Sequence, residues 1–232
     1  MNGGCARAVR RRMFVPARKE DPVKTRKASP NRAPRRILKI ACGAALAVAF
    51  TAVPPASARA EKVTPPPVPA EIAVPAGNRA YLEGHAVGTQ NYICLQAGVG
   101  FSWTFIGPQA TLFDDKAGQI ITHFLSANPE EAGIARATWQ HSRDTSSVWG
   151  QAIALSTDPA FVAPGSIPWL LLSAVGAHAG PTGGRKLTET TFIHRLNTAG
   201  GIAPATGCNT ATDVGKRELV SYTADYFFYR AD

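Results

Sequence analysis

Residues 191–208 read TFIHRLNTAGGIAPATGC, and this stretch decides how the C-terminal half of the chain folds. It begins with β-branched and aromatic residues typical of a strand, is interrupted by Gly200 and Gly201, and ends on Cys208. Residues 219–230, LVSYTADYFFYR, follow it. Every second residue of this second stretch belongs to one mostly apolar face: Val220, Tyr222, Ala224, Tyr226 and Phe228. A period of two predicts a long strand with that face in the core.

The same pattern extends through residues 79–232. Gly and Pro separate short runs rich in β-branched and aromatic residues, and no long segment has a helical period. Strands are predicted at residues 80–85, 90–96, 101–106, 109–113, 119–125, 135–141, 148–155, 168–174, 190–197 and 219–230. Short strands separated by turn signals are typical of sandwiches and barrels. We therefore predict an all-β fold, a single antiparallel β-sandwich or barrel-like domain over residues 79–232.

Residues 1–60 have a different composition. Of the 25 Lys and Arg, 14 lie at or before Arg59, together with only two of the 16 acidic residues. Residues 61–232 contain 11 basic and 14 acidic residues, a net charge of −3, so the formal charge of +9 comes from the leader. The domain itself therefore has no basic excess, and we expect no nucleic-acid partner.

An apolar run at residues 40–53 follows these basic residues. It is too short for a membrane-spanning helix, which needs about 20 residues, but it suits the apolar region of a signal peptide. The small residues that follow predict cleavage after Ala58 or Ala60. The preceding Arg35-Arg36 pair is compatible with twin-arginine or ordinary Sec export. We predict a secreted or periplasmic protein without a membrane span after cleavage.

Residues 61–78 contain five prolines. Such a composition favours an extended polyproline conformation. We interpret these residues as a Pro-rich linker, with a first strand starting near Ile72 as the alternative.

Only Cys94 and Cys208 remain after the predicted cleavage. In an oxidising compartment two cysteines are expected to form one disulfide. The bond would tether the glycine-rich stretch before Cys208 to the strand that contains Cys94. Nothing near either residue in the sequence supplies the base that a nucleophilic cysteine needs.

The sequence contains no recognised catalytic, nucleotide-binding or metal-binding motif. Asp114 and Asp115 are interpreted as a solvated turn between two strands. His123 and His141 are the best candidates for a site assembled from separate strands, although hydrogen-bonded core histidines are the favoured interpretation. We predict no catalytic residue, no bound metal and no cofactor.

Asp225 lies in the middle of the last predicted strand, where an unpaired charge would be costly if it were buried. Arg195, on the preceding predicted strand, is the expected partner. The favoured interpretation is a structural ion pair that orders the sheet, and the alternative is a pair that faces a ligand.

Six sequence blocks occur in order: GTQNYIC at 88–94, ATLFD at 110–114, ATW at 137–139, IPWL at 167–170, RLNTAGGIAPATGC at 195–208, and YTADYFFY at 222–229. Together they resemble the family called domain of unknown function 3455. The resemblance covers nearly all of the chain after residue 79. It implies an exported protein, and it brings no established activity from which catalytic residues could be assigned.

Three functions remain open. The favoured one is an exported module that binds a ligand or surface, with a cell-wall or extracellular polysaccharide as the expected class of partner, because Trp, Tyr and Asn beside charged residues suit sugars. The alternatives are a metal-dependent enzyme with a site of dispersed His and Asp, and a structural envelope protein. A groove lined by tryptophan would favour binding. The candidate ligand-binding residues are Gln90, Asn91, His123, Trp139, Arg195, Asn197 and Asp225.

Overall fold

The computed structural model of the protein describes residues 63–232. The predicted signal peptide and its cleavage sites lie outside the described residues. Within residues 63–232, no helix is long and apolar enough to cross a membrane.

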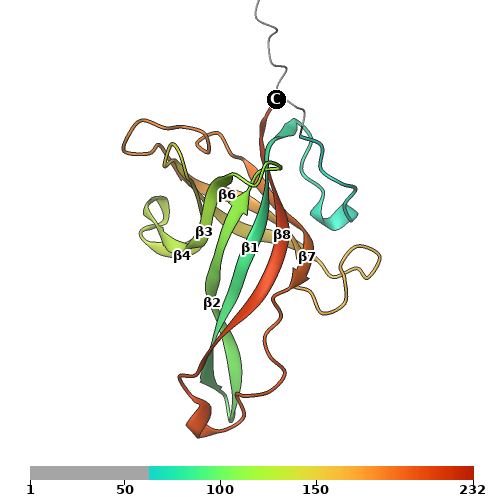
Figure 1. Ribbon diagram of the computed structural model, residues 1–232, viewed down its shortest axis with the longest axis vertical. Helices are drawn as coiled ribbons and strands as arrows, with labels where there is room; N and C mark the ends of the chain where they lie inside the picture. The colour runs from blue at the N-terminus through green and yellow to red at the C-terminus, as the bar shows by residue number, and fades with distance from the viewer. Residues whose placement is uncertain (1–62) are drawn as a thin grey trace, which may run out of the picture. The chain divides into compact units, whose positions relative to one another are not determined.

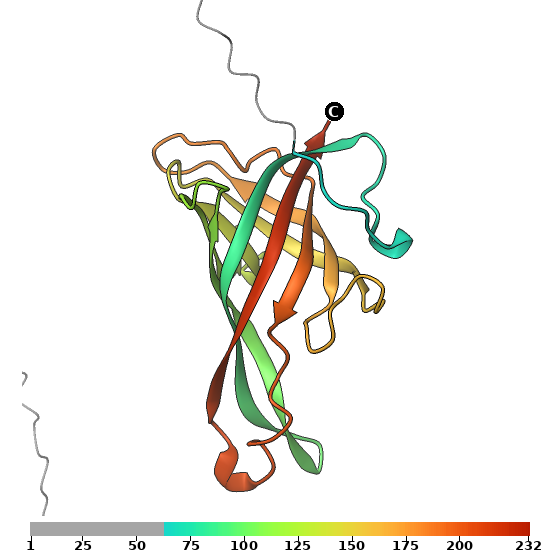
Figure 2. The same cartoon turned by 45° about the vertical axis from the view of Figure 1, so that its right-hand side comes forward.

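Eight antiparallel strands form a closed barrel (Figures 1 and 2). Each strand pairs with the next along the chain, and the last pairs with the first. The strands are β1 (Asn78–Ala97), β2 (Gly100–Phe113), β3 (Gln119–Asn128), β4 (Ile134–His141), β5 (Ser147–Ser156), β6 (Trp169–His178), β7 (Phe192–Gly200) and β8 (Arg217–Ala231). Three short 3-10 helices complete the described elements: η1 (Ala70–Ile72), η2 (Pro129–Glu131) and η3 (Ala211–Asp213). The all-β prediction is confirmed, and the barrel is the form that it takes.

The first two strands are longer than the sequence predicted. Residues 80–85 and 90–96 both belong to β1, and residues 101–106 and 109–113 both belong to β2. The prediction divided β1 near Gly88 because glycine commonly ends strands. In the structure Gly88 lies within β1, where an added Cβ would overlap the carbonyl oxygen of Gln109. Gly88 therefore allows a close approach between two strands and does not end one.

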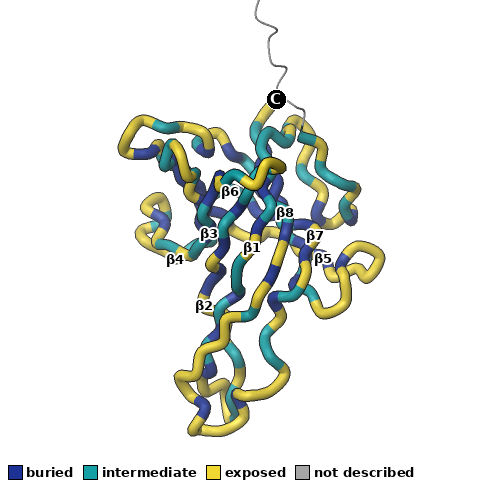
Figure 3. Tube along the Cα trace, in the orientation of Figure 1, coloured by how far each residue is buried: buried dark blue, intermediate teal, exposed yellow. Residues whose placement is uncertain are grey.

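The barrel interior contains the main core. Its β8 contribution is the predicted face of Tyr222, Ala224, Tyr226 and Phe228, all of which are buried. Trp139 packs against this face, with ring centroids 5.6 Å from Tyr226 and 6.1 Å from Phe228. Figure 3 shows that buried positions gather in the body of the barrel, whereas the far end of the β1–β2 hairpin is mostly exposed.

A second core lies on the outer face of the barrel. The segment at residues 63–77 packs there, and Ile72 meets Phe227 and Tyr229 from the outer face of β8 in one buried cluster. His194 anchors the segment: its Nε2 donates a hydrogen bond to the Ile72 carbonyl oxygen at 2.7 Å, and its Nδ1 accepts one from the Tyr229 hydroxyl at 2.9 Å. From residue 63 onward the proline-rich stretch is therefore part of the folded domain.

The predicted disulfide between Cys94 and Cys208 is confirmed. Their Cα atoms lie 5.4 Å apart, and 114 residues separate them along the chain. The predicted interruption at the paired glycines is also present: β7 ends at Gly200, and both Gly200 and Gly201 have positive φ angles. The chain can then leave the sheet, and the disulfide holds the loop that follows against β1.

Replacement of Ile72 by alanine tests whether the outer segment stabilises the barrel. Ile72 is 0 % exposed, so Ile72→Ala should lower the free energy of unfolding by about 2–5 kcal/mol, as core truncations do. The control is Ile134→Ala, at a site 53 % exposed, with an expected change within about 0.5 kcal/mol. Urea unfolding measures both. An equally small loss in the two variants would show that residues 63–77 add no core.

Candidate functional site

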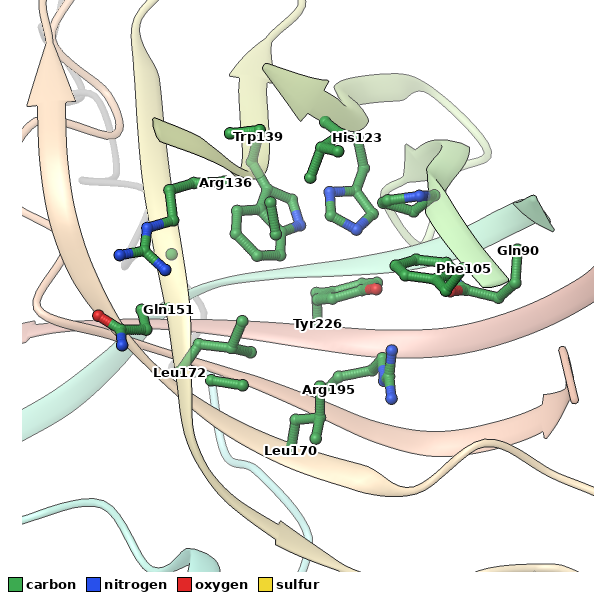
Figure 4. A pocket seen from close by; sticks show the side chains of 16 residues that line it. Gln90, Phe105, His123, Arg136, Trp139, Gln151, Leu170, Leu172, Arg195 and Tyr226 are labelled. Atoms are coloured by element: carbon green, nitrogen blue, oxygen red, sulfur yellow. The ribbon is translucent and has the colours of Figure 1, made fainter. Parts of the chain in front are cut away.

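A cavity of about 250 Å³ lies inside the barrel, and all eight strands contribute residues to its wall (Figure 4). Small residues create the space: Ala137 on β4 and Gly150 and Ala152 on β5 line it in place of larger side chains. Gly150 is needed locally, because an added Cβ would lie 2.9 Å from the Trp139 ring. Several apolar side chains form most of the remaining wall: Phe105, Leu125, Leu170 and Leu172.

An aromatic group forms one side of the cavity. The His123 ring stacks on Trp139 with centroids 4.3 Å apart and an interplanar angle of 10°. His123 Nδ1 lies 2.9 Å from the Thr138 carbonyl oxygen, which can only accept, so Nδ1 carries the proton. Burial lowers the pKa of His123 to about 3. The ring is therefore neutral near pH 7, and its Nε2 is a hydrogen-bond acceptor.

Arg195 brings a positive charge to the cavity wall. Its Nε and Nη2 donate to the Pro168 carbonyl oxygen at 3.3 and 2.8 Å. The guanidinium also lies close enough to the Tyr226 hydroxyl to oppose the rise in the pKa of Tyr226 that burial causes. No Asp or Glu of residues 63–232 lies within ion-pair distance of Arg195.

The predicted ion pair between Arg195 and Asp225 is wrong. Arg195 is opposite Tyr226 in the β7–β8 ladder, whereas Asp225 is opposite Leu196. This one-residue offset places the two charges on opposite faces of the sheet, because adjacent strand residues point to opposite sides. Arg195 faces the interior, and Asp225 lies on the outer face.

Two buried donors in the cavity wall have no hydrogen-bond partner among the described residues. They are Nε2 of Gln90, a residue 3 % exposed, and Nε1 of Trp139, a residue 1 % exposed. Gln90 lies close enough to the Tyr222 hydroxyl to oppose the rise in the pKa of Tyr222 that burial causes, but no acceptor of residues 63–232 lies at hydrogen-bond distance and angle from its Nε2. A buried polar group left without a partner costs about 1–3 kcal/mol. Native proteins rarely keep such donors, so each is a point at which a bound molecule could contribute an acceptor.

Arg136 also lines the cavity, but its charge is compensated. Its Nη2 and Nε donate to the two carboxylate oxygens of Glu131 at 2.6 and 2.8 Å. These bonds hold the pKa of Glu131 at about 2, with Asn128 contributing a further hydrogen bond. Figure 4 shows Arg136 and Gln151 on one side of the cavity, and Arg195 and Gln90 on the other.

The structure brings together four of the seven candidate ligand-binding residues. Gln90, His123, Trp139 and Arg195 all line the cavity. The remaining candidates, Asn91, Asn197 and Asp225, do not line this cavity.

Most of the tryptophans, and His141, also lie away from the cavity. Of the four tryptophans only Trp139 lines the cavity. His141 binds Asp144 through Nδ1 at 3.0 Å and does not meet His123. Sequence reasoning missed Phe105 and Tyr226 as lining residues, although the alternation of β8 did assign Tyr226 to the inner face.

A group of three possible metal ligands, Glu83, His85 and Asp225, lies on the outer face with its ligand atoms within 4.8 Å of one another; residues 63–232 contain no other such group. The ring nitrogens of His85 are both engaged: Nδ1 lies 2.6 Å from Asp225 Oδ1, and Nε2 lies 2.9 Å from Asp115 Oδ1. Asn197 donates to the other oxygen of Asp225 at 2.8 Å. A protonated histidine between two carboxylates accounts for this geometry.

Comparison with known proteins identifies the family. A family described as protein of unknown function (DUF3455) matches residues 75–230. The chain belongs to this family. The match confirms the resemblance inferred from the sequence blocks and begins three residues before β1. No curated protein and no solved structure matches the chain.

The His85 network predicts a pH dependence of stability. The hydrogen bonds that the His85 ring donates to Asp225 and Asp115 raise the pKa of His85 above its ordinary value of 6.5. Its contribution is therefore complete below about pH 6.5 and is lost as the pH rises through the higher pKa of the folded state. His85→Gln should lower the thermal midpoint more at about pH 6 than at about pH 9. An equal decrease at both pH values, measured by circular dichroism, would contradict this.

Proposed function

We propose that this protein is a binding module that holds one small, largely apolar molecule inside its barrel. The observation that carries the proposal is the interior cavity, whose wall combines apolar side chains with the unpartnered donors of Gln90 and Trp139. An eight-stranded barrel is either filled by its own side chains or holds one small ligand. Unpartnered donors are costly in a filled core and useful in a binding site.

Binding is favoured over catalysis by the chemistry of the wall. A general base works best with a pKa near the working pH, whereas the pKa of His123 falls to about 3. The lining contains no carboxylate and no cysteine that could act in its place. The cavity residues therefore suit recognition of a molecule better than its conversion.

The size of the cavity limits its occupant. Its volume of about 250 Å³ is below the roughly 300–1,000 Å³ typical of sites for drug-sized ligands. We therefore expect a molecule of one or two rings, or a short chain. A cell-wall or extracellular polysaccharide stays a separate proposal, because a polymer would need a surface outside this cavity, and a glycan array would test it.

We also propose that the protein acts outside the cytoplasm. The disulfide between Cys94 and Cys208 supports this location, because such bonds persist in oxidising compartments. The basic leader with its apolar run supports the same location.

Obstruction of the cavity tests the proposed function. The probe is 2-naphthol, a two-ring molecule that is neutral near pH 7 and fluorescent, and titration calorimetry measures its binding. Ala152→Trp adds a large side chain at an exposed position of the cavity wall and should weaken binding at least about tenfold.

Ile153→Trp is the matched control. Ile153 is the next residue of β5, is exposed and does not line the cavity, so binding should change less than about twofold. Equal affinity of the two variants would place the probe outside the barrel. No binding of 2-naphthol to the unmodified protein would contradict the proposed function.

A further inference from the structure

We propose that the molecule held in the barrel carries a carboxylate, which Arg195 receives. This inference rests on the proposed function, since it names the class of ligand that the same cavity takes. It would make the protein a binder of small apolar or aromatic carboxylic acids.

The charge balance of the cavity is the first argument. The lining includes two arginines and no Asp or Glu, and Arg136 is neutralised by Glu131. His123 is neutral. The positive charge of Arg195 is therefore left without a counter-ion on its side of the cavity. A partly buried charge is unfavourable until it is paired, so an anionic group gains most by binding there.

The geometry of Arg195 is the second argument. The Nε and Nη2 atoms share the Pro168 carbonyl oxygen, which fixes the guanidinium along one edge. The Tyr226 hydroxyl lies near the guanidinium, but no carboxylate of residues 63–232 pairs with the edge formed by Nη1 and the second proton of Nη2. Two parallel N–H donors match the two oxygens of a carboxylate.

The neighbouring donors give the third argument. Nε2 of Gln90 and Nε1 of Trp139 are buried without acceptors, and both residues line the cavity with Arg195. In Figure 4 the Gln90 and Arg195 side chains lie on the same side of the cavity. A carboxylate has about four lone-pair positions, so it can accept from Arg195 and from a second donor together.

The rest of the wall defines the body of the ligand. The stacked Trp139 and His123 rings present aromatic surface, and Phe105, Leu170 and Leu172 line the cavity with apolar groups. Apolar walls around a few placed polar groups favour a ligand with one polar end. An aromatic ring bearing a single carboxylate has such an apolar body and one polar end.

The test compares two probes with one ring system. At about pH 7, 2-naphthoate is an anion and 2-naphthamide is neutral, and the two have nearly the same shape. Titration calorimetry with the unmodified protein should show 2-naphthoate binding about ten- to a hundredfold more tightly, the range expected for hydrogen bonds to a charged group.

Two variants test which residues cause the preference for 2-naphthoate over 2-naphthamide. Arg195→Met should remove most of it by weakening 2-naphthoate binding at least about tenfold, with a much smaller effect on 2-naphthamide. Gln90→Met removes the amide donor without touching the Pro168 contact, so it tests the site even if Arg195→Met does not fold. Arg217→Met, at an exposed residue that does not line the cavity, controls for loss of one positive charge and should leave the preference unchanged.

The outcomes separate this inference from the proposed function. Equal binding of 2-naphthoate and 2-naphthamide, with 2-naphthol still bound, overturns the carboxylate inference and leaves the binding module intact. An unaltered preference in folded Arg195→Met also overturns it. Failure of all three probes to bind overturns the proposed function itself.

Discussion

The pairing of β8 with β1 closes the barrel, and the interior cavity depends on this closure. The two strands pair from Asn78 opposite Ala231 to Ile93 opposite Arg217, so the seam runs along most of both strands. Closure removes the exposed strand edges that an open sheet would leave. It also places Gln90 of β1 and Tyr226 of β8 in one wall, although more than a hundred residues separate them in the chain. Without the seam the cavity would lose the wall to which these two residues belong.

Alternation along the strands determines which charges face the interior. The offset of one residue between Arg195 and Asp225 puts the guanidinium inside and the carboxylate outside. The outer charge is balanced locally by His85 and Asn197. The inner charge, on Arg195, has no carboxylate partner among residues 63–232. The cavity wall therefore keeps one uncompensated positive charge. The outer face around Phe227 and Tyr229 is in turn covered by the segment that contains Ile72, so both faces of β8 are packed near its C-terminal end.

Much of the fold could be predicted from local patterns, because a period of two and the placement of glycine are local properties. The alternation of Tyr222 to Phe228 identified the inner face of β8, and the count of cysteines identified the disulfide. Strand order and register depend on pairing between residues that are far apart in the sequence. The sequence therefore could not distinguish a sandwich from a barrel, and it paired Arg195 with Asp225 across a ladder that separates them. Gln90, His123 and Trp139 were singled out as individual residues, but only closure of the barrel brings them to one cavity.

If the barrel binds a ligand, the unpartnered donors of Gln90 and Trp139 in the cavity wall receive it. Nuclear Overhauser contacts between 2-naphthoate and the protein test it most directly, because the Trp139 indole N–H and the Gln90 side-chain amide have their own proton signals. We expect contacts from the naphthalene ring to Trp139 and to the methyl groups of Leu170 or Leu172, with shifts of the Trp139 and Gln90 N–H signals on binding. Contacts confined to outer-face residues such as His85, with both N–H signals unmoved, would contradict the account.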